Sequence, residues 1–135
     1  MSLDKLQVYT KTSDYMCWLF PITTAFPKAQ RFVLAQRIEN TVLSIIECII
    51  ESNASRQKVP LIRQALTKLE VLQVLMRFAK DQRFVSLKQY EISSQRLAEI
   101  GRLLGGWMRQ ARQHESRSNP HAQSKPLGGQ FGNPG

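Results

Sequence analysis

The stretch LAEIGRLLGGWMRQAR, residues 97–112, decides the fold class of this chain. Its large apolar residues recur every three or four positions, which places them along one face of an α-helix. The stripe consists of Leu97, Ile100, Leu104, Trp107, Met108 and Ala111. Upstream, Ser86 followed by Gln89 forms the capping-box pattern with which many helices begin. The sequence therefore predicts one long amphipathic helix from Ser86 to about Gln113.

Three earlier segments show the same helical period, so we expect an all-α fold. The first spans residues 3–24 and contains Pro21, which should kink the helix rather than end it. The second spans about residues 28–51, and the third spans residues 60–80, with proline as a favourable first-turn residue. Four long helices joined by short links favour an antiparallel up-down-up-down four-helix bundle.

The 135 residues are enough for one domain with a modest core. We expect residues 1–113 to form the four-helix bundle. Residues 114–135 are rich in proline and glycine, a composition that cannot bury a core. The sequence predicts that this segment is a disordered C-terminal tail.

Two of the expected helices carry more apolar or small side chains than one core needs. The core stripe of the third helix is Ile62, Ala65, Leu69, Leu72, Met76 and Ala79, and a second stripe on its other side is Val71, Val74, Leu75 and Phe78. The fourth helix adds a row of small residues, Ser94, Ala98, Gly101 and Gly105. Glycine inside a helix costs roughly 1 kcal/mol relative to alanine, and a close approach of another helix is the usual reason for it. These extra stripes either thicken one core or form a subunit interface. We favour the interface because Val74 and Phe78 point away from the core stripe.

The charge balance indicates a polyanionic partner. Lysine and arginine total 19 against 10 acidic residues, for a formal net charge of +9. The basic residues that we expect to contact nucleic acid lie on and between the last two helices: Arg63, Arg77, Lys80, Arg83, Arg102, Arg109 and Arg112. Each alone is typical of an ordinary solvated face. Together with the net charge they favour nucleic-acid binding, mainly through phosphate contacts, because aromatic residues are poorly interleaved with them.

We find no motif of an enzyme or a cofactor site, and we expect no catalytic residue, no metal and no cofactor. A glycine-rich phosphate loop, a zinc-ligand spacing and a nucleophile elbow are all missing from the sequence. Arg109 and His114 form an Arg-x4-His pattern that resembles the motif of the HEPN ribonucleases. We weigh that reading as the weaker one, because His114 lies at the expected end of the last helix.

The cysteines and the lengths of the apolar segments indicate in which cellular compartment the protein is expected. Cys17 and Cys48 both lie within apolar helical runs, and we expect both to be buried thiols in a reducing compartment. No apolar run approaches the ~20 residues of a membrane span. The sequence therefore predicts a cytoplasmic protein without a membrane partner.

Several motifs resemble the accessory variability determinant proteins of diversity-generating retroelements, over about residues 8–112. They are Trp18-Leu19-Phe20-Pro21-Ile22, Leu75-Met76-Arg77-Phe78 and, most specifically, Ile100-Gly101-Arg102-Leu103-Leu104-Gly105-Gly106-Trp107. The segment from Phe26 to Ile46 is also similar to the related four-helix-bundle proteins encoded within 23S rRNA intervening sequences, whose role is undefined. That second family remains the alternative reading.

The first resemblance implies a bacterial or phage-encoded homopentamer without an active site. It implies binding to a retroelement reverse transcriptase and to its template-repeat RNA, and possibly to DNA, in support of mutagenic cDNA synthesis. Arg77 and Arg102 fall within the matching motifs and become the leading candidates for a functional role. Gly101 and Gly105 match in packing roles, and the tail lies outside the resemblance.

Overall fold

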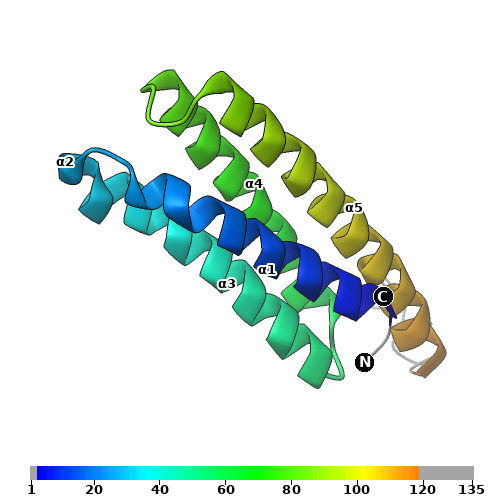
Figure 1. Ribbon diagram of the computed structural model, residues 1–135. Coiled ribbons are helices and arrows are strands. Elements are labelled where there is room, and N and C mark those ends of the chain that lie inside the picture. The colour runs from blue at the N-terminus through cyan, green and yellow to red at the C-terminus, as the bar shows by residue number, and fades with distance from the viewer. Residues whose placement is uncertain (1–2, 119–135) are drawn as a thin grey trace, which may run out of the picture.

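The computed structural model describes residues 3–118, and all secondary structure in that range is helical (Figure 1). Its elements are α1 (Leu3–Thr24), α2 (Lys28–Gln30), the π-helical segment η1 (Arg31–Ala35), α3 (Gln36–Ala54), α4 (Val59–Asp81) and α5 (Leu87–Ser118). Because α2, η1 and α3 follow one another without a break, they form one continuous helix. The chain thus contains the four long helices that the sequence predicts.

Each long helix packs against two neighbours, as in a four-helix bundle. The helix pairs in contact are α1 with α3, α3 with α4, α4 with α5, and α5 with α1. The predicted core stripes of α4 and α5 are buried at all six positions each. In α1 the chain continues in helical form through Pro21 to Thr24, so the proline does not end the helix.

A buried polar pair lies within this core. The Tyr15 hydroxyl of α1 and the Ser93 hydroxyl of α5 are 2.7 Å apart and hydrogen-bonded. Burial raises the pKa of Tyr15 to about 12, against the smaller opposing effects of the Ser93 hydrogen bond and the Arg96 charge. The phenol therefore stays protonated at neutral pH and ties the two helices together.

The turn between α4 and α5 follows two local rules. The Ser86 backbone N–H donates to Gln89 Oε1 at 2.9 Å, and the Gln89 N–H donates to Ser86 Oγ at 3.0 Å, which confirms the predicted capping box. At the end of α4, the Phe84 N–H donates to the carbonyl of Ala79 at 2.8 Å, and Arg83 adopts a φ of 65°. This is a Schellman-type ending in which an arginine occupies the left-handed position that usually holds glycine.

The last helix does not end near Gln113 but continues to Ser118. The extension has a structural reason, because Glu115 Oε2 accepts hydrogen bonds from the backbone N–H groups of Lys58 at 2.7 Å and Val59 at 3.4 Å. A carboxylate at the first turn of α4 satisfies otherwise unpaired donors and complements the helix dipole. The rest of the predicted disordered tail, residues 119–135, lies outside the described residues.

The expectation of two buried cysteines is wrong for one of them. Cys48 is buried in α3, but Cys17 is exposed on α1. Cys17 follows the buried Tyr15 by two residues, which turns it about 200° around the helix and away from the core. The prediction relied on the apolar neighbours of Cys17 in the sequence. The angle of Cys17 around the helix relative to Tyr15 would have predicted its exposure.

None of the helices in residues 3–118 combines the length and the apolar character needed to span a membrane.

Candidate nucleic-acid interface

Five of the seven predicted basic residues lie on the solvent side of α4 and α5. Arg63 and Arg77 are exposed on α4, and Arg102, Arg109 and Arg112 are exposed on α5. Arg102 and Arg109 are seven residues apart, so they lie on one side of α5 about 10 Å from each other along its axis. The two helices pack directly against each other, so these guanidinium groups belong to one half of the bundle.

Gly101 allows α4 and α5 to approach each other closely. A Cβ atom at this position would lie 3.3 Å from Leu69 Cδ2 of α4, tighter than an ordinary contact. The glycine is therefore explained by packing within one chain, where a methyl group would push against a buried leucine. The predicted packing role of Gly101 thus has a partner inside the bundle.

Gly105 and Gly106 have a different neighbour. Cβ atoms at these positions would meet only the Arg109 guanidinium, at 3.9 Å and 3.8 Å respectively. The arginine thus folds back along its own helix over the two glycines. Because the two glycines have no side chains, the surface of α5 is flat there. The Arg109 guanidinium lies over this flat surface, about one helical turn before the Arg109 backbone.

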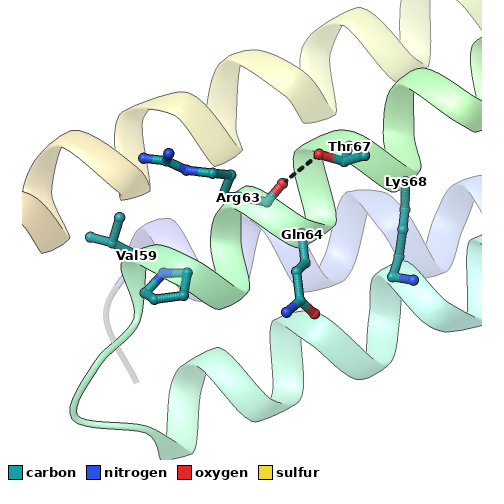
Figure 2. A pocket seen from close by; sticks show the side chains of 6 residues that line it. Val59, Arg63, Gln64, Thr67 and Lys68 are labelled. Atoms are coloured by element: carbon teal, nitrogen blue, oxygen red, sulfur yellow. Dashed lines mark hydrogen bonds between the residues drawn. The ribbon is translucent and has the colours of Figure 1, made fainter.

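A shallow hollow of about 630 Å³ lies along the first half of α4 (Figure 2). Its lining is Val59, Pro60, Arg63, Gln64, Thr67 and Lys68. Figure 2 shows that the Arg63 side chain reaches toward α5, whereas Gln64 and Lys68 point toward α3. The sequence reasoning missed Gln64 and Lys68 as parts of a site. The sequence did contain a signal for them, because their positions around the helix place both residues on the side of α4 that faces away from α5.

Lys80 and Arg83 flank the turn between α4 and α5. The Lys80 ammonium lies 3.3 Å from Asp81 Oδ1 and 4.8 Å from the centre of the Tyr90 ring. It is half-buried, so part of its charge is already balanced inside the chain. Both residues border a second hollow together with Ser86, but Arg83 is exposed and has no ion pair within residues 3–118. Arg83 is therefore better placed than Lys80 to meet a polyanion.

Three of the four residues in the second stripe of α4 are exposed, as the interface hypothesis requires of the isolated chain, whereas Leu75 is half-buried and packs against the core. Val74 is 67% exposed and Phe78 is 52% exposed, and Val71 is also exposed. In the small-residue row of α5, Ala98 is exposed while Ser94 is half-buried. We name Val71, Val74 and Phe78 the α4 outer face. These side chains do not thicken the core of the bundle.

The structure places Arg109 and His114 on different sides of α5. Five helical residues turn the chain by about 500°, which leaves the two side chains about 140° apart. His114 borders a hollow at the end of the bundle, with Lys5 and Arg56, and Arg109 is not part of its lining. A shared acid–base and phosphate site needs both groups within hydrogen-bond reach of one substrate atom.

Lys58, at the same end of the bundle, has a structural task. Its ammonium donates to the carbonyl oxygens of Ser52 at 2.9 Å, Asn53 at 3.3 Å and Ser55 at 2.6 Å. These are carbonyls at the C-terminal end of α3, where a cation is favourable. Burial lowers the pKa of Lys58, and the nearby positive charge of Lys5 lowers it further. Within residues 3–118 no group of three histidine, cysteine, aspartate or glutamate side chains could hold a metal ion.

Comparison with known proteins adds one finding. Residues 6–111 match the protein family described as bAvd-like, a span that runs from the first turn of α1 to about two turns before the end of α5. A search of the curated proteins gave no match.

Proposed function

The chain belongs to the bAvd-like family, the accessory variability determinants of diversity-generating retroelements, and from this we propose that it binds a retroelement reverse transcriptase and its template-repeat RNA. In this role it supports mutagenic cDNA synthesis in the cytoplasm without a catalytic site of its own. We further propose that its helices run alternately up and down and that it assembles into a homo-oligomer. The number five for that assembly comes from the family resemblance.

The observation that carries the proposal is the separation of charge in the bundle. α5 holds six arginines and lysines against three acidic residues, and α4 holds four against two. The continuous helix formed by α2, η1 and α3 is balanced, with three basic residues against three glutamates. A polyanion is therefore attracted to the α4–α5 half, where Arg102 and Arg109 are exposed side by side. Such contacts position a strand through its phosphates and do not read bases.

Self-assembly would strengthen weak contacts of this kind. A ring repeats Arg77, Arg102 and Arg109 once per subunit, and binding at one subunit raises the effective concentration of the strand at the next. Affinity would then come from many equal phosphate contacts, with selectivity supplied by RNA shape or by the transcriptase.

Salt dependence tests this mechanism. The double variant Arg102→Gln with Arg109→Gln should bind template RNA more weakly, because two phosphate contacts per bound subunit are removed. The slope of log affinity against log salt concentration should become shallower by about 1.4 for each subunit on the strand, at roughly 0.7 per phosphate for single strands. Fluorescence anisotropy over a series of salt concentrations measures the slope, and circular dichroism checks that the helix content is unchanged.

A matched control removes two charges from the other half of the bundle. Lys28→Gln with Arg37→Gln has the same net charge as the test variant, and both residues are exposed on the α2–α3 helix. We expect its slope to stay close to that of the unmodified protein. Equal slopes for the test variant and this control would show that net charge alone drives binding and would remove the α4–α5 interface.

Two further readouts of the same mixtures address rival functions. Template RNA should remain intact, since Arg109 and His114 lie on different sides of α5; cleavage that is lost in His114→Ala would establish a ribonuclease instead. Repeating the titration with the transcriptase present separates RNA binding from a purely protein–protein adaptor. An adaptor that uses its basic face only for the transcriptase would show no RNA affinity of its own at physiological salt.

A further inference from the structure

A small hollow lined by three cationic side chains lies at the end of the bundle where α1 begins and α5 ends. Its volume is about 240 Å³. The cations come from segments far apart in the sequence: Lys5 of α1, Arg56 of the loop after α3, and Lys58 directly before α4. In Figure 1, these three segments and the last turns of α5 lie at the same end of the bundle. Neither Arg102 nor Arg109 lines the hollow, so it is separate from the interface proposed above.

The other wall of the hollow comes from the C-terminal extension of α5. His114 and Glu115 line it, and the hydrogen bonds from the Lys58 and Val59 backbone to Glu115 hold these turns in place. Trp107, two turns before His114, also lines the hollow and is only 2% exposed, so it forms a fixed floor. The wall formed by His114 and Glu115 lies beyond residues 6–111 and is a feature of this chain outside the span matched by the family.

One carboxylate does not balance the positive charge in this hollow. Glu115 Oε2 is already used by two backbone N–H groups at the start of α4. Burial lowers the pKa of Lys58, the positive charge of Lys5 lowers it further, and the Glu115 carboxylate acts in the opposite direction. Within residues 3–118 the exposed side chain of Arg56 makes no hydrogen bond or ion pair. An anion in the hollow would reduce the repulsion between the two lysines and give Arg56 a partner.

The donor chemistry and the size of the hollow favour a single phosphate group as this anion. An arginine offers a planar fork of N–H donors that matches phosphate oxygens, and lysine and histidine add single N–H donors. The hollow is smaller than the roughly 300–1,000 Å³ of pockets that enclose drug-sized ligands, so it is suited to one small group and not to a length of strand. A phosphomonoester carries about −1.5 to −2 charges at neutral pH, against about −1 for a phosphate inside a strand. Converging cations therefore favour the phosphomonoester.

We propose that this hollow binds a phosphomonoester, supplied either by a free mononucleotide or by the 5′-terminal phosphate of an RNA. Arg56 is the principal contact, and Lys5 and His114 approach the phosphate from the walls formed by α1 and α5. Glu115 fixes the α5 wall and does not contact the ligand, because its carboxylate repels a phosphate. The site requires neither self-assembly nor RNA binding by the α4–α5 half, so it is tested independently of both.

Calorimetric titration of the full-length protein with AMP and with inorganic phosphate tests the site. Both ligands should bind, whereas adenosine, which lacks the phosphate, should not. Arg56→Gln should weaken AMP binding by about tenfold or more, the factor expected for one charge-assisted hydrogen bond, and Arg56→Lys should retain part of the affinity. Lys28→Gln is the matched control, because it loses the same charge at an exposed position at the other end of the bundle. It should bind AMP like the unmodified protein, and circular dichroism checks the helix content of every variant.

Two RNA oligonucleotides of one sequence, with a 5′-phosphate or a 5′-hydroxyl, distinguish the two sources. If the site receives an RNA end, the 5′-phosphate should tighten binding, and this gain should disappear in Arg56→Gln and in His114→Gln. Equal affinities for the two oligonucleotides, together with AMP binding that depends on Arg56, would assign the site to a free mononucleotide. The proposal is overturned if AMP binds equally to Arg56→Gln and Lys28→Gln. It is also overturned if AMP and phosphate at millimolar concentration fail to bind and the 5′-phosphate has no effect.

Discussion

The two faces of α4 are built from the same kinds of residue and have opposite surroundings. On the inner face, Leu72 and Met76 are almost completely buried between the other helices. On the outer face, Val74 and Phe78 are more than half exposed, although they are only two residues away along the same helix. Helical periodicity thus shows that a helix has two apolar stripes, but the three-dimensional packing decides which of them one chain can cover.

The difference also concerns charge. The inner face of α4 has no charged side chain at its buried positions, whereas the outer side holds the basic residues Arg63, Lys68 and Arg77 and the acidic residues Glu70 and Asp81. An apolar row beside charges of both signs is suited to a partner surface that offers apolar groups and complementary charges. The inner face contributes to folding, and we propose that the outer face serves assembly and polyanion binding.

Shortening one side chain on each face of α4 should give the largest measurable difference between the two faces. Leu72→Ala removes a buried side chain and leaves a cavity, at an expected cost of about 2–5 kcal/mol in the free energy of unfolding. Val74→Ala should change that free energy by less than about 0.5 kcal/mol at protein concentrations where subunits are dissociated. Urea unfolding followed by circular dichroism measures both. Val74→Ala as costly as Leu72→Ala at every concentration would show that Val74 belongs to the core.

The interior also contains a buried hydroxyl group, that of Tyr15, whose contribution to the free energy of unfolding depends on pH. Burial raises the pKa of Tyr15 to about 12 from an ordinary value near 10, so between these values the unfolded chain loses the phenol proton and the folded chain keeps it. Stability from this group is complete below pH 10 and falls as pH rises toward 12, by about 3 kcal/mol in all. Tyr15→Phe should remove this alkaline loss, and at neutral pH it should cost about 1–2 kcal/mol because the buried Ser93 hydroxyl loses its partner.

Unfolding curves between pH 7 and pH 12 test that prediction. Tyr9→Phe is the matched control, because Tyr9 is exposed on the same helix. Its alkaline loss of stability should equal that of the unmodified protein. An identical pH profile for Tyr15→Phe and Tyr9→Phe would contradict the assignment to the buried phenol.

Sequence patterns predicted the features that depend on neighbours in the chain. The stripe from Leu97 to Ala111 and the capping box of Ser86 and Gln89 are both set within one helix, and both are confirmed. The continuation of α5 to Ser118 was missed because its reason lies 57 positions earlier, where Glu115 meets the backbone of Lys58. A contact between distant segments leaves no periodic signal in either of them.

The candidate site shows the same division. The exposure of Arg102 and Arg109 follows from their helical angle relative to the core stripe, so sequence reasoning could place both on the surface. The contact of Lys80 with the Tyr90 ring, and the Arg109 guanidinium lying over Gly105, depend on side-chain conformations in the folded chain. These conformations decide which charges remain available to a partner, and only the structure shows them.

The smallest expected effects concern Arg83 in the α4–α5 turn, where two substitutions distinguish its contribution to stability from its contribution to RNA binding. Arg83 has a φ of 65°, a left-handed conformation that is unfavourable for a residue with a Cβ atom. Arg83→Gly should therefore raise the free energy of unfolding by about 0.5–1 kcal/mol, after allowance for the greater freedom of glycine in the unfolded chain. The same change should weaken RNA binding slightly, with a salt slope shallower by at most about 0.7 per bound subunit. Arg83→Ala is the matched control, because it loses the same charge but keeps the Cβ atom, and it should weaken binding equally without a gain in stability. Equal stabilities for the two variants would refute the backbone argument. Unchanged RNA affinity in both variants would show that the Arg83 charge does not contact RNA and would remove Arg83 from the interface. The left-handed arginine would then carry a cost in stability that no contact with nucleic acid offsets.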